Sequence, residues 1–203
     1  MKWTLLAAVV AASGPVLAGT ATVPPPGGVV IDVVTANGSS CRPGTVAVAL
    51  SPDREAFTVT YSEYLAAAGA GAKTGDATRK CKLTVQLQVP DGVAYAVTQA
   101  DYRGFASLAS GANAVLRASY RFQGDPQPTP VEHPFPGPWA DDWQVTDRTE
   151  PVVFGPCGKA RKFTIDTELT VDAGTATAQS NFIVMDSTDG SFGTTYRIAW
   201  RSC

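Results

Sequence analysis

The chain has 203 residues, a formal net charge of −2 and 17% charged residues. A chain this close to neutral, without a clustered basic face, is not expected to bind nucleic acid or a membrane surface. Its length is sufficient for one domain with a sizeable core.

Residues 1–18 have the parts of a secretory signal. Lys2 supplies the positive charge, Leu5–Ala12 the apolar stretch, and Val16–Ala18 the small residues of a cleavage site. The apolar stretch is far shorter than the roughly 20 residues of a membrane helix. We expect cleavage after Ala18, a Pro/Gly-rich tether at residues 19–28 and a single domain at residues 29–203. The protein should be secreted, to the extracellular space or the cell wall, and should not be membrane-bound.

The four cysteines are Cys41, Cys81, Cys157 and Cys203. In an exported chain they indicate two disulfides, for which three pairings exist. We favour Cys41–Cys81 and Cys157–Cys203, because each bond then closes a loop within its own part of the chain and the second one anchors the last residue. With no C-x-x-C pair and a single histidine, the sequence predicts neither a metal nor a cofactor.

Short segments of alternating apolar and polar residues dominate the rest of the sequence. The clearest runs through Cys81, Leu83, Val85 and Leu87, and residues 163–171 repeat the pattern. Such alternation is typical of sheets with one buried face. The only helix candidate, Tyr64–Ala72, has no amphipathic stripe. The sequence predicts an all-β fold: an antiparallel β-sandwich of about nine to ten strands with local connections, two disulfides and one long proline-rich loop.

That loop is expected at residues 124–151. It holds 7 of the 15 prolines and six acidic residues against one base, Arg148. Proline at this density disfavours regular structure. We therefore interpret the segment as an irregular, acidic loop that joins two β segments, each with two cysteines.

The same segment holds the candidate binding residues. Aromatic rings with a polar tip and neighbouring carboxylates are typical of carbohydrate sites, and binding residues concentrate in loops on a rigid scaffold. The predicted ligand-binding residues are His133, Phe135, Trp139, Asp141, Asp142 and Trp143. Trp139 and Trp143 would stack on a ligand, and Asp141 and Asp142 would be polar contacts.

We hypothesise a monomeric module that binds a cell-wall polysaccharide or an extracellular protein. Alternatively, both tryptophans cover a sheet edge or a core opening. Two other classes stay open: a glycan-active enzyme that uses the loop carboxylates, and a structural or inhibitor-like module.

No catalytic residue is assigned. His133 is the sole histidine, and no Gly-x-Ser-x-Gly elbow accompanies it. Asp141 and Asp142 are adjacent, so their side chains tend to point apart and one would need a distant partner. Calcium ligation by these acids and Asp147, or by Asp186 and Asp189, matches no twelve-residue calcium loop.

Asn37-Gly38-Ser39 has the pattern of an N-glycosylation sequon. The predicted glycosylation of Asn37 applies if the source is a eukaryote. An ordinary turn before Cys41 is the other interpretation.

Several stretches, taken in order and spacing, resemble the secreted bacterial and fungal proteins grouped as domain of unknown function 4360. The resemblance runs from about Asn37 to Cys203, and one departure is Arg42, where the family is expected to have proline or a similar residue. It implies secretion, a β-sandwich and the same cysteine framework, but no activity. The matching stretches are Asn37–Asp53, Phe57–Gly69, Arg79–Gly92, Asp101–Gly124 and Trp200–Cys203.

Overall fold

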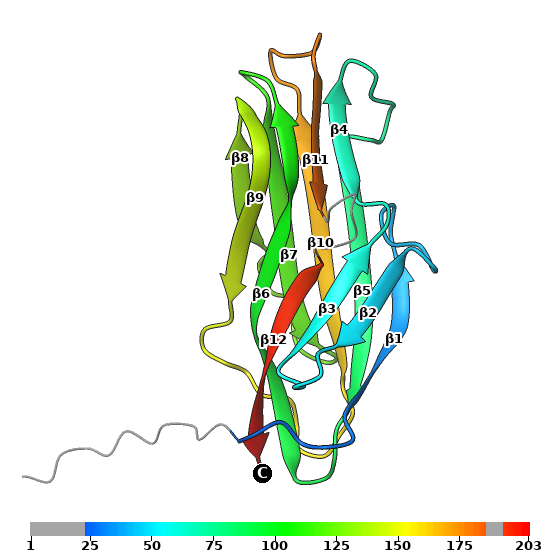
Figure 1. Cartoon of the computed structure of the whole chain (residues 1–203), viewed down its shortest axis with the longest axis vertical. Helices are drawn as coiled ribbons and strands as arrows, with labels where there is room; N and C mark the ends of the chain where they lie inside the picture. Colours follow the sequence, from blue (N-terminus) through cyan, green and yellow to red (C-terminus); the bar gives the residue numbers. More distant parts are fainter. Residues whose placement is uncertain (1–22, 186–192) are drawn as a thin grey trace, which may run out of the picture.

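The computed structural model describes residues 23–185 and 193–203. Across these residues the chain forms strands, turns and irregular segments without a helix, so no helix of the described part could cross a membrane. The strands pack as two antiparallel sheets, one of five strands and one of seven (Figure 1). The predicted signal peptide lies outside the described residues, as do Asp186 and Asp189.

The five-stranded sheet has the order β1-β5-β10-β7-β8. Its long central strands alternate between buried and polar positions, as the sequence pattern predicts. Cys81, Leu83, Val85 and Leu87 face the core, whereas Lys80 and Lys82, on the opposite face of the strand, are exposed. The strands are β1 (Val30–Asn37), β5 (Thr78–Gln88), β7 (Asn113–Phe122), β8 (Val131–Pro136) and β10 (Lys162–Asp172).

The seven-stranded sheet has the order β2-β3-β12-β6-β11-β4, with β9 pairing on β6. The strand β6 is long enough to pair with β12 along one half and with β9 and β11 along the other. The strands are β2 (Val46–Leu50), β3 (Ala56–Tyr61), β4 (Leu65–Gly69), β6 (Val93–Leu108), β9 (Trp139–Arg148), β11 (Ser180–Met185) and β12 (Thr194–Ser202).

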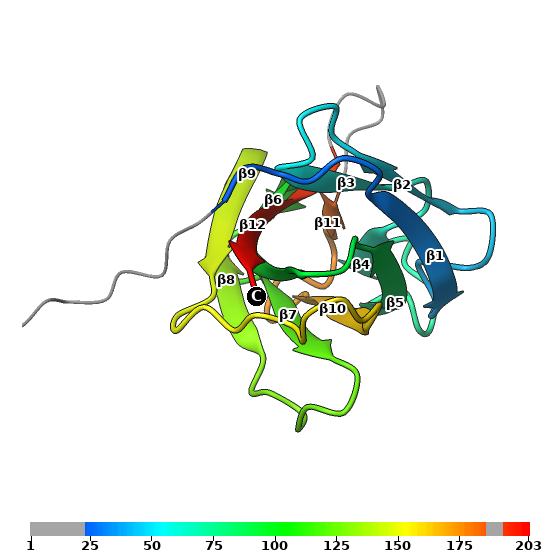
Figure 2. The same ribbon diagram turned by 90° about the horizontal axis from the view of Figure 1, so that it is seen from below.

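Seen from below, the two sheets enclose one core (Figure 2). At one side of the sandwich β1 lies next to β2, and at the other side β8 lies next to β9. The β-sandwich prediction is confirmed, although the described residues contain twelve strands. One of the additional strands, β4, occupies the stretch that was the helix candidate. Its small residues pair with β11 instead.

Both predicted disulfides are present, Cys41–Cys81 and Cys157–Cys203. The idea of two successive β segments is wrong, however. Strands from both halves of the chain alternate within each sheet: β10 lies between β5 and β7, and β12 lies between β3 and β6. The core is therefore shared by the two halves.

The interpretation of residues 124–151 as one irregular loop is also wrong. It contains β8 and β9, which are joined by a turn at Gly137 and Pro138. The two strands pair with different sheets and not with each other, and the term β8–β9 hairpin is used below for these two strands and their turn. Proline lacks a backbone donor but is tolerated at a sheet edge, where one side of the strand pairs with nothing. Pro134 and Pro136 lie on β8, which is the edge strand of its sheet.

Candidate functional site

The β8–β9 hairpin connects the two sheets at one side of the sandwich. Its first strand pairs with β7 of the five-stranded sheet, and its second pairs with β6 of the seven-stranded sheet. His133 of β8 and Asp147 of β9 meet between them, with 2.5 Å from His133 Nε2 to Asp147 Oδ1. The side chain of Asp147 is 4% exposed. The hairpin is thus fixed by a polar contact between the sheets.

A short line of hydroxyls continues this contact into the core. The Tyr120 hydroxyl donates to Asp147 Oδ2, and the Tyr102 and Tyr120 hydroxyl oxygens lie 2.5 Å apart. Burial raises the pKa of both phenols well above its ordinary value, because the charged form would lose its hydration. These groups are neutral donors that hold the buried carboxylate in place.

We expect Asp147→Ala to destabilise the fold by about 3 kcal/mol, since it removes the shared acceptor of His133 and Tyr120 from a buried site. Urea unfolding of the mature protein measures this change. Asp142→Ala on the same strand is the matched control, because its side chain is exposed. Equal stability of the two variants would show that the contact between the sheets contributes nothing.

Two of the predicted binding residues belong to the core. Phe135 is 3% exposed and Trp143 is 4% exposed, and their ring centroids lie 5.1 Å apart. An exposed stacking role for Trp143 is therefore wrong. The alternative, in which the tryptophans cover a core opening, holds for this one. Gly104 makes room for the indole, because a Cβ there would lie 2.6 Å from Trp143 Cζ2.

Trp139 differs from Trp143, because its ring is only partly buried. The indole N–H donates to the carbonyl of Asp141 at 3.0 Å, and Phe135 packs against the ring edge-on at 5.9 Å. The carboxylates of Asp141 and Asp142 are exposed, and Asp141 Oδ1 accepts the N–H of Asp142. Among the six predicted residues, Trp139 is thus an aromatic residue whose ring is held by neighbouring groups and is still partly accessible to solvent.

A hollow of about 380 Å³ lies beside Trp139. Pro138, Trp139 and Ala140 line one side of it, and Ser107, Gln179 and Ser180 line the other, from β6, from the turn before β11 and from the first residue of β11. Within residues 23–185 and 193–203, these three polar side chains donate or accept no hydrogen bond. The lining of the hollow therefore includes one partly buried aromatic residue and three polar side chains without a partner in these ranges, a composition that suits a hydroxylated ring.

Three turns contribute residues to this hollow. They lie at the upper end of the sandwich in Figure 1. Asn181, which is fully buried, fixes two of them. Its Oδ1 accepts the N–H of Ala109 at 2.7 Å, and its Nδ2 donates to the carbonyls of Ala176 and Gln179. The third turn packs closely at Gly137, where a Cβ would lie 2.1 Å from the Ala109 carbonyl oxygen. The hollow is thus preformed.

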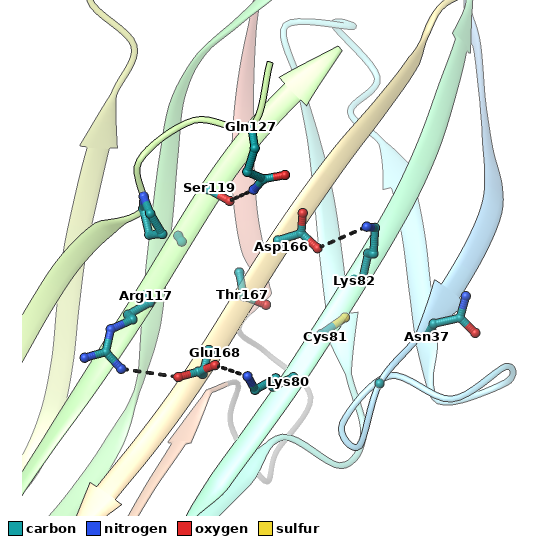
Figure 3. Close-up of a pocket in the computed structure, with 13 residues that line it drawn as sticks. Asn37, Lys80, Cys81, Lys82, Arg117, Ser119, Gln127, Asp166, Thr167 and Glu168 are labelled. Carbon is teal, nitrogen blue, oxygen red and sulfur yellow. Dashed lines mark hydrogen bonds and ion pairs between the residues drawn. The ribbon is translucent and has the colours of Figure 1, made fainter. Parts of the chain in front are cut away.

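A second concave feature, a groove of about 480 Å³, lies on the outer face of the five-stranded sheet. Figure 3 shows its ion pairs: Glu168 lies between Arg117 and Lys80, at 3.2 and 2.7 Å, and Asp166 faces Lys82 at 4.0 Å. Arg117 also contacts Glu132, and this hydrogen bond raises the pKa of its guanidinium. Glu168 and the two bases beside it, Lys80 and Arg117, therefore all take part in ion pairs.

The polar groups next to these ion pairs, farther along the groove, have weaker contacts. Ser119 is 5% exposed, and among the described residues its hydroxyl has one contact, a long one of 3.5 Å with the Gln127 amide, which reaches over it from the segment after β7 (Figure 3). Asp166 is opposite Ser119 in the register. The groove thus has a polar floor between a covering segment and β1.

Asn37 lies at the end of β1 on the margin of this groove and is exposed. The Ser39 hydroxyl accepts the N–H of Lys80 at 3.0 Å, and a Cβ at residue 38 would lie 2.2 Å from the Lys80 carbonyl oxygen. Each residue of the sequon therefore has a place in a tight turn. Glycosylation of Asn37 stays a prediction.

The sequence interpretation missed the polar residues of both concave features. Ser107, Gln179 and Ser180 come from segments more than 70 residues apart, so no spacing in the sequence connects them. The groove residues did carry a signal, because they are the outward positions of the two clearest strands. Among the described residues, no group of three or more His, Cys, Asp or Glu side chains is placed to hold a metal ion.

Comparison with known proteins adds a family to this description. Among solved structures, the enzymatically active domain of bacteriophage CBA120 tailspike protein 4 matches 87% of this chain at 9% identity, with a TM-score of 0.23. The match spans only 20% of the tailspike chain, and a likeness this low carries no argument.

A closer relative is an uncharacterized secreted protein of Arthroderma benhamiae. It is 31% identical over 187 residues, which cover 91% of this chain and 76% of the relative. The two disulfides also fit an extracellular protein, and the protein is secreted. The family described as Domain of unknown function (DUF4360) matches residues 27–203. The predicted resemblance is confirmed, and the chain belongs to this family.

Proposed function

We propose that this secreted protein is a carbohydrate-binding module that attaches to a cell-wall or extracellular polysaccharide through Trp139. Of the predicted binding segment at residues 133–143, only part would contact the ligand. Trp139 supplies the stacking surface and Asp141 fixes the ring through its carbonyl. His133, Phe135 and Trp143 support the hairpin from within. Asp142 is an exposed neighbour on the same strand.

The observation that carries the proposal is the hollow beside Trp139. A pyranose ring has an apolar face and a rim of hydroxyls, so it needs an aromatic surface and hydrogen-bonding groups at its edge. Trp139, which is partly exposed and lines the hollow, would provide the first, and Ser107, Gln179 and Ser180 would provide the second. Because Asn181 and the Phe135 ring already fix these parts, little conformational entropy is lost on binding.

The test is retention of the mature, disulfide-bonded protein on insoluble chitin, cellulose, peptidoglycan and whole cell walls. We expect retention on at least one matrix. Trp139→Ala should weaken it by roughly tenfold or more, equivalent to about 1.4 kcal/mol, because the stacking surface is lost. Trp139→Phe should restore most of it, since a ring remains.

Gln144→Ala is the matched control, because Gln144 is exposed on β9 and does not contribute to the hollow. Unchanged retention of Trp139→Ala would contradict the proposal, as would a parent protein that binds no matrix. A loss of retention in Gln144→Ala as large as in Trp139→Ala would also contradict it.

A further inference from the structure

We propose that the outer face of the five-stranded sheet is a second binding site, for a polysaccharide that carries carboxylates. This site shares no residue with the Trp139 hollow and does not depend on it. The groove shown in Figure 3 adjoins a further hollow of about 290 Å³ along the same strands. Lys82, Asp166 and Ser119 line the groove, and the residues two positions along, Thr84, Thr164 and Arg121, line the hollow.

The lining of this face is positively charged. Five bases and two acids line the two concavities, although the whole chain is slightly acidic. Glu168 is paired with Lys80 and Arg117. The face therefore has an excess of positive charge at its other end, around Arg121 and Lys162.

The bases at this end of the face are not neutralised. Arg121 and Lys162 form no ion pair with any residue in the ranges that the structure describes, and Lys82 reaches Asp166 only at 4.0 Å. Arg121 is opposite Thr164, two residues after Lys162. The spacing of strands and residues in a sheet then separates the Cα atoms of Arg121 and Lys162 by roughly 8 Å. Two cations at this distance can contact one carboxylate or two successive ones.

Polar side chains form the floor between the bases. The hydroxyls of Thr84 and Thr164 lie 3.3 Å apart, and both residues are 9% exposed. With Ser119 and the Gln127 amide they offer donors and acceptors that suit sugar hydroxyls. Arg121 matches the planar geometry of a carboxylate.

The occupant must therefore carry both hydroxyls and well-separated negative charges. A uronic-acid polymer does so, with one carboxylate on each sugar. A densely charged polymer of phosphates or sulfates fits less well, because Asp166 and Glu168 face the same groove and would repel it.

The experiment measures binding of the mature protein to polygalacturonate, to its fully methyl-esterified form and to dextran sulfate at low ionic strength. We expect binding to polygalacturonate that the ester removes and that added salt weakens. The double variant Arg121→Gln/Lys162→Gln should lose roughly tenfold or more of the affinity, because two charge-assisted hydrogen bonds disappear. Trp139→Ala should keep it.

The matched control is Lys73→Gln/Arg148→Gln, which removes the same charge from exposed positions outside both concavities. Three results would overturn the proposal: no binding to polygalacturonate, equal binding to its ester, or an equal loss in the two double variants. Tighter binding to dextran sulfate than to polygalacturonate would also overturn it, because density of charge would then be the determinant.

Discussion

Replacing Trp143 with alanine should destabilise the protein by about 3–5 kcal/mol, the usual effect of removing a large aromatic side chain from a core. Trp143 is 4% exposed and packs against Phe135 and the Gly104 backbone. Trp139→Ala, four residues away, should lower the free energy of unfolding by only about 1 kcal/mol, because its ring is already partly in solvent. Chemical denaturation of both variants measures the difference.

Trp143→Phe provides a control, because Trp143 contributes packing and no hydrogen bond. Among the described residues, nothing accepts a hydrogen bond from the indole N–H of Trp143. Trp143→Phe keeps much of the packing and loses no hydrogen bond, so it should be milder than Trp143→Ala. Similar effects of alanine at positions 139 and 143 would contradict the assignment of one tryptophan to the core and the other to a binding surface.

Above about pH 10 the protein should unfold cooperatively, because its tyrosines are held neutral in the core. Burial raises the pKa of Tyr64, Tyr102, Tyr120 and Tyr196 well above the ordinary value of 10.0, and it also raises the pKa of Tyr95. In the unfolded chain the same phenols ionise near pH 10.

The direction of this pH dependence follows from the number of protons that the folded and the unfolded states bind. Below pH 10 both states keep the phenol protons, so the stability is complete. As the pH rises above 10 only the unfolded chain loses them, and each buried tyrosine then removes on the order of 1 kcal/mol of stability per pH unit. Five such groups exceed a typical stability of about 5–15 kcal/mol within a few pH units.

Tyrosinate absorbance and circular dichroism, followed together during an alkaline titration, measure this effect. We expect both signals to change in one steep step. Gradual ionisation near pH 10 with the fold intact would contradict the burial of these phenols.

The sequence was sufficient to predict the β-sandwich, the buried face of its clearest strands and the pairing of the cysteines. Alternation at Cys81, Leu83, Val85 and Leu87 predicts which side of β5 is buried, because the period of a strand leaves no other assignment. Local pairing of the cysteines also proved correct. The order of strands could not be predicted in the same way, since β10 reaches its place between β5 and β7 only through contacts distant in the sequence.

Residues 124–151 carry two conflicting signals, because the density of prolines disfavours regular structure while the alternation within residues 139–147 favours a strand. Trp139, Asp141, Trp143, Val145 and Asp147 have the period of a strand, and this pattern was visible in the sequence. The alternation could not predict how deeply each tryptophan ring is buried. Trp143 packs against Phe135 and the Gly104 backbone and is buried, whereas Trp139, at the first position of β9, also contacts Phe135 but is only partly buried.

The most direct test of the proposed function is the indole N–H resonance of Trp139 in a two-dimensional nitrogen–proton spectrum, assigned with Trp139→Phe. Soluble fragments of chitin, cellulose and peptidoglycan would be titrated into the mature protein. We predict that one class shifts this resonance at saturation while the buried Trp143 and Trp200 remain unchanged. A Trp139 signal that no fragment moves would contradict a carbohydrate site at this residue.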